Sequence, residues 1–160
     1  MKKENKTNAM RMLDKLKLPY EAVYYECEEF IDGVHIADML GQPYERSFKT
    51  LVMQGKSKNY FVFVLPIAEE VDMKKAARVV GEKSLEMLHV KDIQAVTGYI
   101  RGGVTSIGMK KRYPTVIDAS AEKFDKIIVS GGMLGTQIHL APSDLQKAVS
   151  GSFADITMDH

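Results

Sequence analysis

The feature that most limits the fold is a pair of apolar segments separated by a short polar turn. Residues 47–53 and 59–66 have strand composition, and residues 54–57 (QGKS) between them are typical of a hairpin turn. The second segment contains the sequence FVFVL at residues 61–65, which is apolar at every position. A strand without a polar face is buried on both sides, so we expect it in the centre of a covered sheet.

Helical and strand patterns alternate along the rest of the chain. Because consecutive strand pairs are mixed with helices, the sequence predicts an α/β protein of the α+β type, with a mixed sheet and flanking helices. A length of 160 residues favours a single domain over residues 1–160. The helices are expected at residues 7–18, around 36–40, at 73–80 after the capping Asp72, at 90–96 and at 142–149, and the other strands at 20–26, 115–118, 126–130 and 137–140.

The charge and cysteine content restrict the partners and the compartment. Lys and Arg number 22 against 21 Asp and Glu, so any contact with RNA requires a local basic patch or a partner that holds the RNA. Cys27 is the only cysteine, which fits a reducing compartment. The polar N-terminus and the lack of a transmembrane-length apolar run predict a cytoplasmic protein, with neither a membrane nor DNA as a partner.

Common catalytic motifs are missing from the sequence. The four histidines (His35, His89, His139 and His160) do not pair at metal-ligand spacing, so we expect no metal and no cofactor. There is no Gly-x-Ser-x-Gly, no Walker loop and no Gly-x-Gly-x-x-Gly. Cys27 with a distant histidine would make a nucleophile pair, but a small buried thiol is the simpler interpretation.

Lys49 is the first unusual residue. With a period of two it shares a strand face with Leu51 and Met53, where a cation needs water or an acceptor. One interpretation is an edge-strand lysine whose ammonium reaches solvent. The other is a lysine at the mouth of a pocket that binds a phosphate or a carbonyl group.

Two glycine-rich segments are the second unusual feature. Four glycines occur in residues 98–108, and three more in residues 130–135, directly after the strand at 126–130. Each segment alone would be read as a turn. Together they favour a site built from backbone amides that approach a ligand closely.

These segments carry a resemblance to a known family. Gly98-Tyr99-x-x-Gly102-Gly103-x-x-x-x-Gly108-x-Lys110-Lys111 resembles the signature loop of the YbaK/EbsC family of Cys-tRNA(Pro) deacylases. Ser130-Gly131-Gly132-x-x-Gly135 resembles the second loop of the family, and Phe48-Lys49-Thr50-Leu51 resembles the strand that holds its essential lysine. The motifs occur in the family's order over nearly the whole chain.

The resemblance implies a fold and a function. The family is similar to the editing domain of bacterial prolyl-tRNA synthetases, with a mixed, partly barrel-like β-sheet surrounded by helices. It implies a trans-editing hydrolase that deacylates mischarged tRNA, above all Cys-tRNA(Pro), by backbone-amide stabilisation and by attack of the cysteine substrate's own thiol. Its implied partners are mischarged tRNA, chiefly tRNA(Pro), and prolyl-tRNA synthetase. By position, Lys49 would be the essential lysine, Tyr25, Thr50, Gly102, Gly103, Ser130 and Gly131 would bind the substrate, and Lys110, Lys111 and Arg112 would meet tRNA phosphates.

Two departures from the family pattern leave the amino-acid specificity open. Thr105-Ser106 replaces the usual Ser-Pro of the first loop, and Gln137 stands where some members carry an acidic residue. The alternatives are therefore a deacylase for alanine or another amino acid, and a non-catalytic module that binds tRNA or a synthetase. A general small-ligand binding protein that uses the glycine loops is a third.

Overall fold

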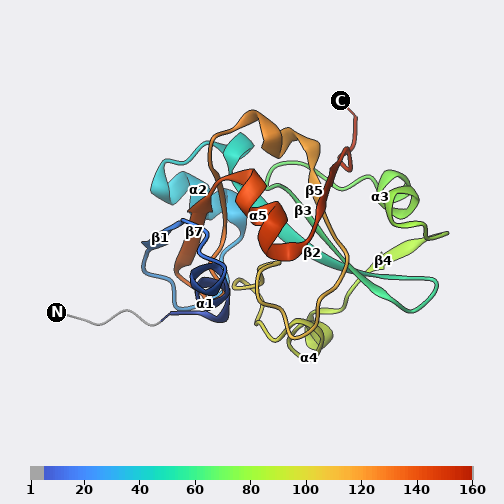
Figure 1. Cartoon of the computed structure of the whole chain (residues 1–160), viewed down its shortest axis with the longest axis horizontal. Coiled ribbons are helices and arrows are strands. Elements are labelled where there is room, and N and C mark those ends of the chain that lie inside the picture. Colours follow the sequence, from blue (N-terminus) through green and yellow to red (C-terminus); the bar gives the residue numbers. More distant parts are fainter. Residues whose placement is uncertain (1–5, 160) are drawn as a thin grey trace.

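The strands form two sheets in the computed structural model, which describes residues 6–159. β2 (Phe48–Gly55) and β6 (Ile127–Ser130) lie on different sheets, and a parallel bridge between Ser47, directly before β2, and Ile128 joins the two sheets. The β-structure is thus mixed and partly barrel-like, as predicted, but within residues 6–159 it does not close into a barrel. The smaller sheet has the order β1 (Glu21–Tyr24), β7 (Thr136–Leu140), β6 (Ile127–Ser130), and the larger sheet has the order β4 (Leu85–Met87), β2 (Phe48–Gly55), β3 (Tyr60–Pro66), β5 (Thr115–Asp118), β8 (Ser152–Ala154) (Figure 1).

The predicted hairpin is confirmed and forms the centre of the larger sheet. β2 and β3 are antiparallel with Lys49 opposite Leu65, whereas β3 and β5 are parallel with Phe63 opposite Val116. Residues 61–65 of β3 are all buried, which confirms that this strand is covered on both faces. The strand that most restricts the fold therefore lies in the centre of the larger sheet.

The predicted helices are present, with ends close to those that the sequence indicates. They are α1 (Asn8–Lys15), α2 (Gly33–Leu40), α3 (Met73–Val80), α4 (Ile93–Thr97) and α5 (Pro142–Val149). Thr7, Asp32 and Asp72 cap the first three, and Gly41 and Gly81 end α2 and α3 in the left-handed conformation. Within residues 6–159, no helix has both the length and the apolar character that a membrane span requires.

Short elements were missed by the sequence patterns. β4 and β8 contain three residues each, too few for a period of two to be read. The first half of the helix expected at 90–96 is a 3₁₀ turn, η2 (Val90–Asp92), and two further 3₁₀ turns are η1 (Tyr44–Arg46) and η3 (Ala119–Lys123).

The helices cover separate apolar clusters on the sheets. α1 and α5 pack over the smaller sheet and one face of the larger one, through Met10, Leu13 and Leu145 among others. α3 covers the other face of the larger sheet with Ala76 and Ala77. Figure 1 shows β1 and β7 at one end of the molecule and α3 with β4 at the other. This arrangement leaves the region between β2 and β6 for a cavity.

Candidate active site

A cavity of about 400 Å³ lies where the two sheets meet. Its walls come from β2, β4, β6 and β7, from α2, and from the loops that follow β1 and α4. Most of the lining is apolar, with a small number of polar groups, as in ordinary small-molecule sites. The side chains with polar or charged groups are Tyr25, Asp32, Gln42, Ser47, Lys49, Thr50, Arg101, Ser130, Thr136 and Gln137.

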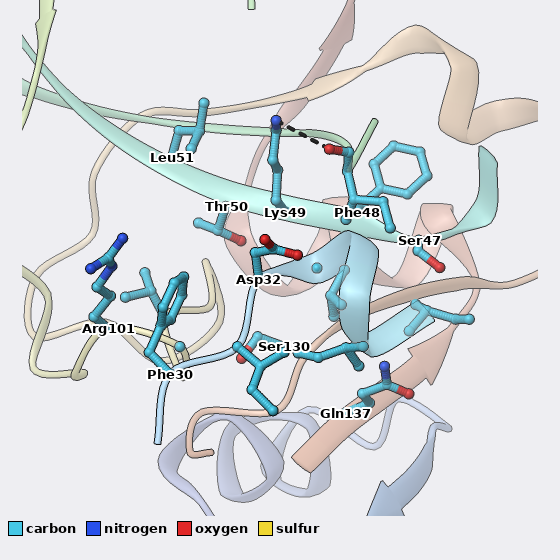
Figure 2. A pocket seen from close by; sticks show the side chains of 18 of the residues that line it. Phe30, Asp32, Ser47, Phe48, Lys49, Thr50, Leu51, Arg101, Ser130 and Gln137 are labelled. Atoms are coloured by element: carbon cyan, nitrogen blue, oxygen red, sulfur yellow. Dashed lines mark hydrogen bonds between the residues drawn. The ribbon is translucent and has the colours of Figure 1, made fainter. Parts of the chain in front are cut away.

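Lys49 lines this cavity from β2. Figure 2 shows Lys49 and Leu51 extending from the same side of the strand, and the Lys49 Nζ donates a hydrogen bond to the Ile67 carbonyl at 3.3 Å. Burial lowers the pKa of Lys49, and the nearby carboxylates of Glu70 and Glu69 oppose this effect. The ammonium is therefore half-buried and held by one neutral acceptor.

Thr50 presents its backbone to the cavity from the open edge of β2. The Ser47 carbonyl accepts a bond from Ile67 N on the β3 side, and the Val52 carbonyl accepts one from Leu88 N on the β4 side. Since antiparallel pairing alternates along a strand, the N–H and C=O of Thr50 point away from β3. β4 pairs only with Met53–Gly55, so the Thr50 amide is available to a ligand.

The two glycine-rich segments pack directly against each other. A Cβ on Gly103 would lie 2.8 Å from Met133 Cα, and a Cβ on Gly102 would lie 2.5 Å from Leu134 Cδ2. Gly102 lines the cavity with a φ of 91°, whereas Gly103 is packed behind the wall. Glycine is therefore required at these positions for loop contact as well as for access of a ligand.

Side-chain hydrogen bonds, one within the first loop and one from the N-cap of α1, hold the loops in place. The Tyr99 hydroxyl donates to the Ile107 carbonyl at 2.6 Å within the first loop, and burial raises the pKa of Tyr99 to about 12. The Thr7 hydroxyl, which also caps α1, donates to the Gly131 carbonyl at 2.6 Å. Gly131 lies behind the cavity wall, where its N–H donates to Thr136 and closes the turn. The loops are thus preorganised by neutral hydrogen bonds.

Ser130 lines the cavity at the end of β6, and its hydroxyl oxygen is buried without a hydrogen-bond partner. Buried hydroxyl groups are normally paired, because desolvation of an unpaired one costs about 1–3 kcal/mol. A polar group on a ligand would supply the missing partner.

An amide pair that the sequence did not predict forms part of the cavity lining. Gln42 Nε2 donates to Gln137 Oε1 at 2.8 Å, and Gln137 Nε2 donates back to Gln42 Oε1 at 3.0 Å. His139 Nε2 lies 3.2 Å from the same Gln137 oxygen, and burial lowers the pKa of His139. This part of the cavity lining therefore carries neutral amide groups and no carboxylate.

Phe30 and Arg101 join two loops at the cavity. The Arg101 guanidinium lies 4.0 Å from the centre of the Phe30 ring, and both residues line the cavity (Figure 2). They connect the segment after β1 with the first glycine loop. No sequence pattern pointed to this pair, because its members are far apart in the chain.

The predicted site residues divide into two groups. Lys49, Tyr25, Thr50, Gly102 and Ser130 all line the cavity, while Gly103 and Gly131 support its wall. The basic residues at 110–112 lie elsewhere: Lys110 donates to the Ala95 carbonyl, and Lys111 and Arg112 border a second hollow beside α5. Within residues 6–159, no group of three His, Cys, Asp or Glu side chains is placed to hold a metal ion.

Comparison with known proteins assigns the family. The model of the aminoacyl-tRNA editing domain matches residues 33–148, which include β2 and both glycine loops. The chain belongs to the aminoacyl-tRNA editing domain family.

One relative and two solved structures are similar to this chain over nearly its whole length. EbsC of Enterococcus faecalis, whose name assigns it Cys-tRNA(Pro)/Cys-tRNA(Cys) deacylation, is 45% identical over 157 residues, covering 98% of this chain and 96% of the relative. A solved structure described as a trans-editing enzyme for prolyl-tRNA synthetase has a TM-score of 0.81 at 20% identity, covering 98% of this chain and all of the other. Another, described only as a hypothetical protein, has a TM-score of 0.86 at 17% identity over 94% of this chain and 99% of the other. The two structures show that the fold is shared.

Proposed function

We propose that this chain is an aminoacyl-tRNA deacylase that hydrolyses the ester of Cys-tRNA(Pro) and Cys-tRNA(Cys). The observation that carries the proposal is the cavity at the junction of the sheets, with Lys49, Thr50, Gly102 and the unpartnered Ser130 hydroxyl around it. The 45% identity to EbsC over nearly the full length supports the same substrate class.

The site is suited to an ester that is already activated. In the proposal, the Thr50 N–H and the amides of the glycine loops stabilise the developing oxyanion. Lys49 orients the ester or the terminal nucleotide, Ser130 donates to the bound ester group, and Tyr25 and Gly102 complete the walls. The neutral amide pair of Gln42 and Gln137 lies next to the amino-acid side chain.

The cysteine substrate supplies the nucleophile in this proposal. Its thiol sulfur attacks the ester carbonyl carbon, the bond to the tRNA 3′ oxygen breaks, and the thiol proton passes to that oxygen. The products are a cyclic thioester and uncharged tRNA, and water then opens the thioester to cysteine. A mostly apolar cavity with a small number of polar and charged side chains fits this role, because it has only to hold the geometry.

Lys110, Lys111 and Arg112 contact acceptor-stem phosphates in the proposal, and prolyl-tRNA synthetase delivers the mischarged tRNA in the cytoplasm. The balanced net charge of +1 supports delivery by a partner rather than capture of RNA by the domain alone. Co-migration of the chain with the synthetase in the presence of tRNA(Pro) tests this part.

Single-turnover deacylation of Cys-tRNA(Pro), Cys-tRNA(Cys) and Ala-tRNA(Pro) tests the function. We expect loss of the cysteine ester with a cyclic thioester detectable by rapid quenching, and slow reaction of a tRNA charged with S-methylcysteine. Equal rates for both cysteine derivatives would remove the thiol mechanism and leave the deacylase. A stable complex without ester loss would replace the deacylase by a binding module.

A further inference from the structure

One carboxylate lines the cavity in the part of the chain that the structure describes. Asp32 is the only acidic residue among the lining side chains, together with the cations Lys49 and Arg101. In the view of Figure 2, its carboxylate lies between the β2 side chains and Ser130. The side chain is 54% exposed, so a ligand that enters the cavity can reach it.

Both contacts of the Asp32 carboxylate with His35 involve its Oδ1 atom. Oδ1 accepts from the backbone N–H of His35 at 2.9 Å and lies 2.8 Å from His35 Nδ1. These bonds, the backbone one first, and a weaker backbone contact from Val34 hold the pKa of Asp32 below its usual range, so the group is ionised at neutral pH. Oδ2 takes no part in the two contacts with His35 and can accept from a ligand.

The two cations of the cavity are engaged with other groups. The charges that act on Lys49 are those of Glu70 and Glu69, and its Nζ donates to the Ile67 carbonyl. The guanidinium of Arg101 lies over the Phe30 ring. Neither cation is therefore paired with Asp32, whose ionisable neighbour is the exposed His35. The negative charge of Asp32 can interact with a cationic group of a bound ligand.

We propose that Asp32 binds the α-ammonium group of the aminoacyl ester and makes the site specific for substrates with a free amino group. This inference rests on the proposed deacylase function. Every unblocked aminoacyl-tRNA carries the ammonium on the carbon next to the ester carbonyl, whereas peptidyl-tRNA and other N-acylated esters lack the charge. Recognition of this group holds the ester in one orientation whatever the amino-acid side chain.

The helix cap formed by Asp32 offers a competing explanation for the residue, and a conservative substitution separates the two. Asn caps a helix about as well as Asp, so Asp32→Asn keeps the cap of α2 and removes the charge. Asp72 caps α3 in the same way, through bonds from Lys74 N and Lys75 N, and it does not line the cavity. Asp72→Asn is therefore a matched control.

The test uses a stable amide-linked analogue, cysteine joined to 3′-amino-3′-deoxyadenosine, in free and N-acetylated forms. We expect Asp32→Asn to weaken binding of the free-amine analogue about five- to tenfold, as for loss of a partly exposed charged contact. Binding of the acetylated form should be unchanged, and Asp72→Asn should resemble wild type with both. Deacylation of Cys-tRNA(Pro) and of N-acetyl-Cys-tRNA(Pro) by the same proteins should follow this pattern.

Equal affinity of wild type and Asp32→Asn for the free-amine analogue would overturn the inference and leave the deacylase intact. Equal losses of affinity of Asp32→Asn for the free-amine and the acetylated analogue would also overturn the inference, because such losses would show that the substitution acts only on the structure. A wild-type protein that binds the free-amine analogue but hydrolyses no ester would contradict the proposed function and not the ammonium site. A wild-type protein that binds neither analogue would contradict both.

Discussion

Burial of the Lys49 ammonium opposes stability in the free protein. Its lowered pKa means that the folded state holds the proton less tightly than the unfolded chain does. The resulting penalty is present at neutral pH and disappears only as the amine deprotonates under alkaline conditions. A lysine at such a position on a strand face is more easily explained by ligand binding than by folding.

Substitution of Lys49 should therefore separate stability from activity. We expect Lys49→Met to melt at the wild-type temperature or above it, while single-turnover deacylation falls about ten- to a hundredfold, as for loss of a charged hydrogen bond. Lys49→Arg should restore little activity, because a planar guanidinium does not replace a compact ammonium at a half-buried position. Lys56→Met, at an exposed position in the hairpin turn, is the control. A folded Lys49→Met protein with the wild-type rate would exclude Lys49 from the site.

Ser130 allows a similar test with a neutral group. Because its hydroxyl is buried without a partner, Ser130→Ala should leave the free energy of unfolding unchanged or raise it by up to about 1 kcal/mol. If a bound ester supplies the partner, the same change should lower kcat/KM about tenfold. Denaturant unfolding and deacylation kinetics measure the two effects. A less stable but fully active variant would show that the hydroxyl serves the fold.

At the scale of elements, close packing of the two glycine loops shapes the wall of the site. Gly103→Ala places a methyl group against the backbone of Met133, and backbone cannot move away as a flexible side chain can. We expect a loss of about 1–3 kcal/mol in stability together with reduced activity, because the loop that carries Gly102 shifts with it.

Gly41→Ala provides the comparison. Gly41 ends α2 at a φ of 65° with nothing within 4 Å of an added Cβ, so only the backbone conformation is unfavourable, by about 1 kcal/mol. Its deacylation rate should remain that of wild type. Thermal melting curves and deacylation rates of Gly103→Ala and Gly41→Ala test this prediction. Equal loss of activity in the two variants would exclude a special role for the contact between the loops.

The elements that the sequence predicted best are those with local signals at both ends. The predicted bounds of α3 coincide with the observed ones because Asp72 caps the helix and Gly81 ends it, and those of β5 and α5 coincide as well, with Pro142 opening α5. β4 and β8 have no such signals and owe their conformation to the strands beside them. The amide pair of Gln42 and Gln137 spans 95 residues, so only the tertiary fold brings its members together. The family resemblance predicted the two loops together with Lys49, Thr50 and Tyr25, but not Asp32, Gln42, Phe30 and Arg101, which also line the cavity.

At the scale of the whole molecule, the even charge balance makes the position of basic groups more informative than their number. Lys110, Lys111 and Arg112 follow the first glycine loop but lie outside the cavity lining. They can therefore affect tRNA binding without changing the ester site.

Replacement of Lys110, Lys111 and Arg112 by Gln should raise the KM for the charged tRNA and reduce the salt dependence of deacylation. The slope of log kcat/KM against log salt concentration should fall by about 0.7–0.9 for each tRNA phosphate that the protein no longer neutralises. The triple variant Lys74→Gln, Arg78→Gln and Lys83→Gln removes the same charge from exposed positions on and after α3. Identical slopes for the two variants would assign the effect to net charge and not to direct binding of tRNA.

The junction between the sheets has a consequence for motion. Within residues 6–159, the pairing of Ser47 with Ile128 is the one β-bridge between the two sheets, and the cavity lies beside it. A ligand in the cavity contacts both sheets, so it should restrict the motion of one sheet relative to the other. We expect a bound substrate analogue to slow amide hydrogen exchange in β6 and at the start of β2, and to leave β5 and α3 nearly unaffected. Uniform protection across the chain would instead mean that the two sheets already open and close as one unit.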